Sequence, residues 1–131
     1  MNKEFVEYNE ALQLKELGFD EPCLAWHYPK LGTIEIGAIN KNSDEWLMGR
    51  NCTAPLYQQA FRWFREKHQM HHQIIIRDLD KYKEGNPDFQ LMIYTNTPVT
   101  LHKLKNCKAY EEAELECLKQ LIKIVKKKNN G

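Results

Sequence analysis

Aromatic side chains are interleaved with arginines and amides in the stretch YQQAFRWFR, residues 57 to 65. A planar ring can stack on a nucleobase, and an arginine can bind a phosphate group through two parallel hydrogen bonds. A tryptophan and a histidine stand side by side earlier in the chain. The candidate ligand-binding residues are Arg62, Arg65, Trp63, Tyr57, Trp26 and His27. The chemistry that they favour is the capture of a small nucleotide-like molecule.

A structural role competes with this interpretation, because aromatic residues at helical spacing commonly form a core. Six apolar residues between 56 and 64 cover more than one face of a helix. The pattern favours core positions for Phe61 and Phe64. It leaves Trp63 and Tyr57 open to either role.

Three histidines, His68, His71 and His72, form the main cluster of potential metal ligands. They lack the HExxH or Cys/His spacing of a zinc site. A metal-dependent enzyme built on this cluster is therefore an alternative, and no metal or other cofactor is expected.

Catalytic signatures of other kinds are missing from the sequence. Ser43 is the single serine and lacks the flanking glycines of a nucleophile elbow. The glycines are scattered, so neither a phosphate-binding loop nor a dinucleotide fingerprint is present. We expect no catalytic residues and no enzymatic activity.

Composition narrows the function further. The net charge is +1 and the isoelectric point is near 7.7, whereas a general nucleic-acid-binding domain has a value above about 9. The four cysteines form no CxxC pair and are expected to be free thiols in a reducing compartment. No secretory signal opens the chain, and no apolar run approaches the ~20 residues that span a bilayer. We expect a cytoplasmic protein that contacts neither membranes nor nucleic acids in general.

The hydrophobic periodicity predicts a small α+β fold. Helices are predicted at about 5–17, 53–68 and 110–127. Strands are predicted at about 23–28, 33–39, 72–77 and 89–95. We expect one compact domain spanning residues 1–131, with an antiparallel sheet of about four strands and three helices in the order α-β-β-α-β-β-α. The later strands are apolar on both faces, which favours central positions for them, and whether all four strands share one sheet is open.

Three segments show local similarity to known sequences: EALQLKELGFDEPC at 10–23, APLYQQAFRWFREK at 54–67 and YEEAELECLK at 110–119. Together they resemble a group of small uncharacterised proteins of Bacteroides-type gut bacteria and their phages. The resemblance covers the three helical blocks and less of the strands. It implies a phage or mobile-element accessory protein, and so favours binding or inhibition over metabolism.

These observations lead to a ranked expectation. The first hypothesis is a non-enzymatic binding protein, homo-oligomeric, that sequesters a nucleotide-like signalling ligand as anti-defence proteins of phages do. The first alternative is an inhibitor that docks on a host or phage protein through the same aromatic surface. The second alternative is the metal-dependent enzyme.

Overall fold

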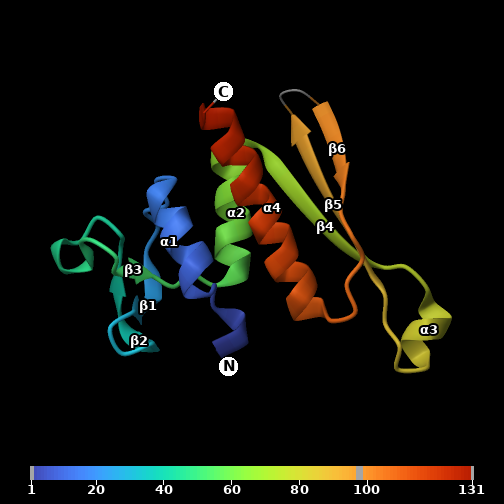
Figure 1. Cartoon of the computed structure of the whole chain (residues 1–131), viewed down its shortest axis with the longest axis horizontal. Coiled ribbons are helices and arrows are strands. Elements are labelled where there is room, and N and C mark those ends of the chain that lie inside the picture. Colours follow the sequence, from blue (N-terminus) through green and yellow to red (C-terminus); the bar gives the residue numbers. More distant parts are fainter. Residues whose placement is uncertain (1, 97–98, 131) are drawn as a thin grey trace. The chain divides into compact units, whose positions relative to one another are not determined.

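The computed structural model describes residues 2–96 and 99–130, and its contacts group into two compact units. Unit 1 comprises Met1–Ala60 together with Val125–Gly131, and unit 2 comprises Phe61–Ile124. The fold is α+β, as predicted (Figure 1). Helices α2 (Tyr57–His68) and α4 (Tyr110–Asn130) each contribute residues to both units.

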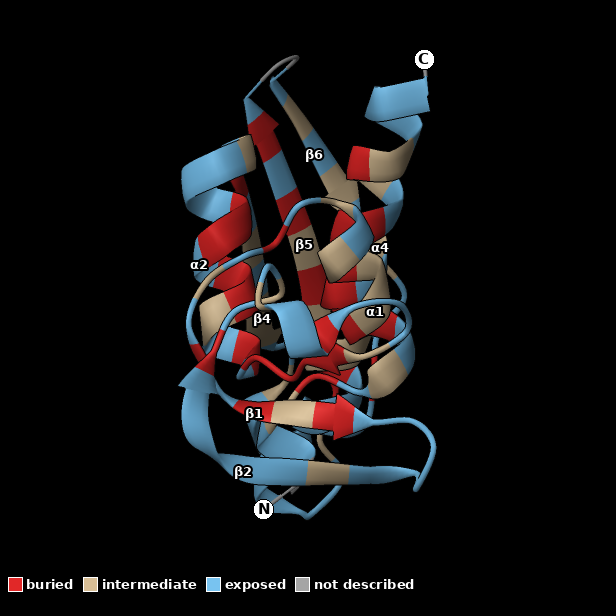
Figure 2. Cartoon of the chain, turned by 90° about the vertical axis from the view of Figure 1, so that its left-hand side faces the viewer, coloured by how far each residue is buried: buried red, intermediate tan, exposed pale blue. Residues whose placement is uncertain are grey.

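In its described residues, unit 1 contains one α-helix, two short 3-10 helices and one small antiparallel sheet besides its parts of α2 and α4. Its elements are η1 (Asn2–Glu4), α1 (Tyr8–Glu16), β1 (Cys23–Tyr28), β2 (Thr33–Asn40), η2 (Glu45–Leu47) and β3 (Cys52–Thr53). The strand order is β2-β1-β3. Figure 2 shows β1 alternating between buried and less buried residues, while β2 is exposed along most of its length. Strand β2 is therefore an edge strand of this sheet.

The end of α1 follows directly from the sequence. Gly18 adopts a positive φ of 99°, which glycine tolerates without a steric penalty. The backbone N–H of Phe19 then donates to the carbonyl of Leu14 at 2.9 Å, which closes a Schellman-type cap. Phe19 and Leu14 are both buried, so the cap also anchors the helix on the core of unit 1.

Unit 2 contains a second antiparallel sheet, with the strand order β4-β5-β6. Its further elements are β4 (Met70–Ile76), α3 (Leu79–Lys83), β5 (Phe89–Asn96) and β6 (Val99–Lys103). Alternate residues of β5 are buried, as expected of a sheet with one covered face. On α4, Cys117, Leu118 and Leu121 are buried at the helical spacing that the sequence predicts.

Several expectations about the sheets were wrong. Among the described residues the strands form two sheets of three strands, because the short strands β3 and β6 add to the two predicted pairs. Strand β4 lies at an edge, and Met70 alone of its residues is buried. Its three consecutive isoleucines form an apolar run, but they lie in an edge strand and not in a central one. Strand β5 is central, as predicted. Helix α3 was not predicted, and the Asp78 carboxylate caps it by accepting hydrogen bonds from two backbone N–H groups.

The first two helices begin later than predicted, because long-range backbone pairing holds the preceding residues extended. The N–H of Val6 donates to the carbonyl of Pro55 at 2.8 Å, and Phe5 forms a β-bridge with Leu56. The N–H of Ala54 donates to the carbonyl of Ala25. Helix α1 therefore starts at Tyr8 and α2 at Tyr57. The expectation of a single domain stays a prediction.

Candidate ligand-binding site

The predicted ligand-binding residues of α2 divide between its two sides. Arg62 and Arg65 are exposed, whereas Trp63 is 5% exposed and Tyr57 6%. Trp63 packs edge-on against Phe64, with ring centroids 5.1 Å apart. Trp63 and Tyr57 are thus buried core residues in this structure, and their role in binding a ligand stays a prediction.

The three histidines of the proposed metal cluster do not converge. His71 and His72 are consecutive residues of β4, so their side chains point to opposite faces of the sheet. His72 stacks on Phe61 of α2 at a centroid distance of 3.7 Å, and burial lowers the pKa of its imidazole to about 4. Within the described part of the chain, no group of three or more His, Cys, Asp or Glu side chains could hold a metal ion. This geometry does not support the metal-dependent alternative.

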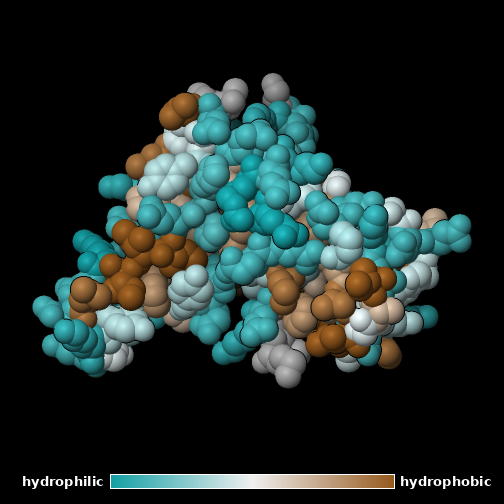
Figure 3. Space-filling view, turned by 180° about the vertical axis from the view of Figure 1, so that it is seen from behind, coloured by the Kyte–Doolittle hydropathy of each residue, from teal (hydrophilic) through white to brown (hydrophobic). Residues whose placement is uncertain are grey.

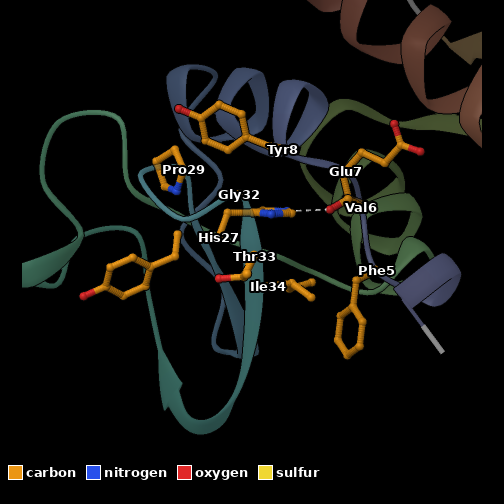
Figure 4. Close-up of a pocket in the computed structure, with 10 residues that line it drawn as sticks. Phe5, Val6, Glu7, Tyr8, His27, Pro29, Gly32, Thr33 and Ile34 are labelled. Atoms are coloured by element: carbon orange, nitrogen blue, oxygen red, sulfur yellow. Dashed lines mark hydrogen bonds between the residues drawn. The ribbon is translucent and has the colours of Figure 1, made fainter.

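A pocket of about 380 Å³ lies in unit 1, between the segment preceding α1 and the turn of the β1–β2 hairpin (Figure 4). Apolar side chains form much of its lining, among them Phe5, Tyr8, Tyr28 and Ile34. His27 contributes an imidazole to the same lining. Of the six predicted ligand-binding residues, His27 is the one that lines this pocket.

Both walls of the pocket are fixed by backbone hydrogen bonds. On the hairpin side, the N–H of Leu31 donates to the carbonyl of Tyr28 at 3.0 Å, and Gly32 takes a φ of +66° to complete the turn. The residue types of Pro29-Lys30-Leu31-Gly32 are those of a tight turn. On the other side, the bonds of Phe5 and Val6 to the segment before α2 hold the chain extended. The pocket is therefore preformed, and no element has to move to create it.

The hydrogen bonding of His27 defines the polar chemistry of the pocket. Its Nε2 lies 2.7 Å from the carbonyl oxygen of Val6, and since a carbonyl can only accept, Nε2 must carry the proton. Burial lowers the pKa of His27 below its usual range, although the Val6 carbonyl and the nearby Glu7 act in the opposite direction. The imidazole is therefore neutral at pH 7, and Nδ1 is left as a hydrogen-bond acceptor.

Neighbouring groups hold this imidazole in place. The ring of Tyr8 meets it edge-on, with centroids 5.7 Å apart. The Tyr8 hydroxyl donates to the carbonyl of Arg50 at 2.8 Å, which positions the tyrosine in turn. His27 itself is 9% exposed. The site thus presents an oriented imidazole within a mostly apolar lining, which also includes Glu7 and Thr33.

Charge is nearly absent from the pocket. Of the residues that line it in the described part of the chain, Glu7 alone is acidic and none is lysine or arginine. A phosphate group in the pocket would lack a cationic partner. The lining therefore suits the uncharged part of a ligand.

Trp26 lies on the other side of β1 from His27, because consecutive residues of a strand alternate between faces. It pairs with Glu35 across the sheet and meets Trp46 edge-on at a centroid distance of 5.2 Å. The indole N–H of Trp46 donates to Asn40 at 3.0 Å. The adjacent pair Trp26-His27 thus contributes one residue to an aromatic cluster and the other to the pocket.

Comparison of the chain with protein-family models, with curated proteins and with solved structures finds no match. In the part that the structure describes, no helix has the length and apolar character needed to cross a membrane.

Proposed function

We propose that the chain is a non-enzymatic binding protein that captures a small nucleotide-like signalling ligand, with the base in the pocket of unit 1. The single observation that supports this proposal is a preformed, mostly apolar pocket with one oriented polar group. Its volume of about 380 Å³ is that of a small-molecule site. The flat base of a nucleotide fits between the aromatic side chains of the lining, and the phosphate groups of the nucleotide would extend toward solvent.

A binding role accounts for the pocket better than catalysis does. General acid–base catalysis requires a side chain that can gain and lose a proton at working pH. The proton on Nε2 of His27 is held by the buried Val6 carbonyl. The lowered pKa also disfavours proton uptake by the ring. His27 is thus suited to recognise a ligand.

Some parts of this proposal rest on the sequence. Arg62 and Arg65 are exposed on α2, and their role as phosphate-binding groups stays a prediction. The homo-oligomeric state, the cytoplasmic location and the phage or mobile-element origin stay predictions as well.

Native mass spectrometry tests the proposal. Gently purified protein, before and after incubation with a panel of linear and cyclic nucleotides, should carry a stoichiometric nucleotide-like mass that is released on denaturation. Tyr28→Ala should lose that mass, because Tyr28 lines the pocket and is exposed enough to be replaced without damage to the core. Tyr82→Ala is the matched control, since Tyr82 is an exposed tyrosine on α3 in unit 2. An apo mass throughout, or equal loss in both variants, would contradict the proposal.

A second candidate function, an inhibitor that acts by protein–protein contact, is favoured by the surface of the same sheet. Leu24 and Ile39 on β1 and β2 are 53% and 66% exposed. Figure 3 shows apolar surface gathered over this part of the chain, as at many protein-interaction sites. Strand β2 also carries a single charged residue and no proline to protect its open edge. A stoichiometric protein partner that is lost in Ile39→Asp and kept in Tyr28→Ala would favour this function over ligand capture.

A further inference from the structure

We propose that Nδ1 of His27 selects the ligand of the unit 1 pocket: it accepts a hydrogen bond from an N–H or O–H group of an uncharged planar ring. This inference rests on the proposed function, because it names the chemistry of the molecule that the pocket takes. It predicts a preference for rings that donate a hydrogen bond over rings of the same shape that only accept one.

The Val6 carbonyl fixes which nitrogen of His27 is left to accept a hydrogen bond. Val6 is fully buried, and its own N–H is bonded to Pro55 at 2.8 Å, so the backbone at this position is held from two sides. The carbonyl therefore keeps its place 2.7 Å from Nε2 of His27. Rotation of the imidazole would break this bond and leave a buried carbonyl without a donor, which is costly. The orientation of His27 is set by the protein and not by the ligand.

The remaining nitrogen, Nδ1, is an acceptor of a residue that lines the pocket, beside the Glu7 carboxylate and the Thr33 hydroxyl. No donor in the described part of the chain forms a hydrogen bond with it, and His27 is more than nine-tenths buried. An acceptor that is left unbonded in a largely apolar lining gains from a ligand that supplies the missing donor. A ligand that presents an acceptor at this point would instead meet the lone pair of Nδ1.

The surrounding side chains specify the rest of the ligand. Phe5 and Pro29, which Figure 4 labels, belong to the apolar part of the lining. Tyr28 lines the pocket as well. Glu7 is the acidic group of the lining and repels an anion, while a cation would lose most of its hydration among the apolar walls. A neutral planar ring that bears a donor satisfies all of these groups. Nucleobases belong to this class.

Indole and benzofuran are the probes that test the inference. The two molecules share size, shape and zero charge, but indole carries an N–H where benzofuran carries an oxygen acceptor. Indole should bind on the order of tenfold more tightly, because benzofuran leaves Nδ1 unbonded. Protein labelled with ¹⁵N-histidine should show the His27 Nδ1 resonance moving on addition of indole and staying in place with benzofuran. The spectrum of free protein should show the proton on Nε2.

Variants separate the role of Nδ1 from that of the pocket as a whole. His27→Lys retains a donor for the Val6 carbonyl but has no acceptor, so it should lose the preference for indole. His102→Lys, at a histidine on β6 in unit 2, is the matched control and should keep it. If His27→Lys does not fold, the response of the Nδ1 resonance in the unmodified protein tests the inference. Equal affinities with no change at Nδ1, both reduced in Tyr28→Ala, would overturn the inference and leave the pocket as a ligand site. Binding of neither probe would also overturn it, and the proposed function falls only if the nucleotide panel fails as well.

Discussion

Acidification should destabilise the protein through His72. The imidazole of His72 stacks on Phe61, and its pKa in the folded protein is about 4 against an ordinary value of 6.5. Desolvation by burial is the largest cause, and the charges of Arg65 and His71 add to it. Between these two pH values the unfolded chain binds more protons than the folded one, so stability falls as the pH falls.

The size of the effect follows from the shift. The difference between a pKa of 6.5 and one of about 4 corresponds to a total loss of about 3.4 kcal/mol in the free energy of unfolding. The full loss is reached only at a pH below the pKa of His72 in the folded protein. From pH 7 to pH 5, the free energy of unfolding should decrease by about 2 kcal/mol. His27 acts in the same direction, because burial lowers its pKa as well.

Urea unfolding at pH 7, 6 and 5, followed by circular dichroism, measures this dependence. His72→Phe keeps a ring on Phe61 but removes the titrating group. Between pH 7 and pH 5 its free energy of unfolding should therefore fall by about 2 kcal/mol less than that of the unmodified protein. His102→Gln is the matched control: His102 and His72 pair with the same residue, Ile93, from opposite sides of β5. An NMR titration should place the pKa of His72 well below 6.5. A His72 that titrates near 6.5, or equal losses of stability in His72→Phe and the unmodified protein, would refute the reasoning.

Three further expectations concern stability and thiol reactivity. Phe64→Ala should lower the free energy of unfolding by about 3–5 kcal/mol, measured with guanidinium, because Phe64 is fully buried. Arg62→Ala, on the exposed side of α2, should change it by less than about 0.5 kcal/mol. Gly18→Ala should cost about 1 kcal/mol in the same assay despite the open space around Gly18, because its φ is +99°; an unchanged midpoint would show that the cap tolerates alanine. Burial raises the pKa of three thiols to about 11 or 12, so they should react with a thiol reagent only slowly until the protein is unfolded, and rapid labelling of folded protein, located by mass spectrometry, would contradict this. These thiols are Cys23, Cys52 and Cys117.

Much of the local structure could be predicted from the sequence because it depends on neighbours. The spacing of apolar residues on α4, the stop of α1 at Gly18 and the hairpin turn before Gly32 are short-range features, and the structure contains all three. Strand β3 is two residues long, so it has no periodicity to detect. It exists because Cys52 and its neighbour pair with β1, which is 25 residues or so earlier in the chain.

The candidate site was harder to predict for a related reason. His27 and the hairpin turn were identified from their residue types. The other wall of the pocket was assigned to a helix, because Phe5 and Tyr8 fit the apolar spacing of the helix that follows. Local spacing cannot reveal that Val6 is bonded to Pro55, and this bond is what keeps the wall extended. Likewise, the residue types of Trp63 and Tyr57 suited a ligand, but their burial depends on tertiary packing.

The path of α4 has a consequence for protein synthesis. Its last turns, from Val125 onward, belong to unit 1, where Lys126 donates to the side chain of Gln13 at 2.6 Å although the two residues are 113 positions apart. Unit 2 is one continuous stretch of chain. Unit 1 is discontinuous, so the segment Met1–Ala60 is synthesised well before the residues from Val125 onward that belong to the same unit. A growing chain therefore carries an unfinished unit 1 while the whole of unit 2 is translated. A chain cut just before Val125 would lose the contact of Lys126 with Gln13 and the rest of the α4 part of unit 1, whereas unit 2 would still be complete in sequence.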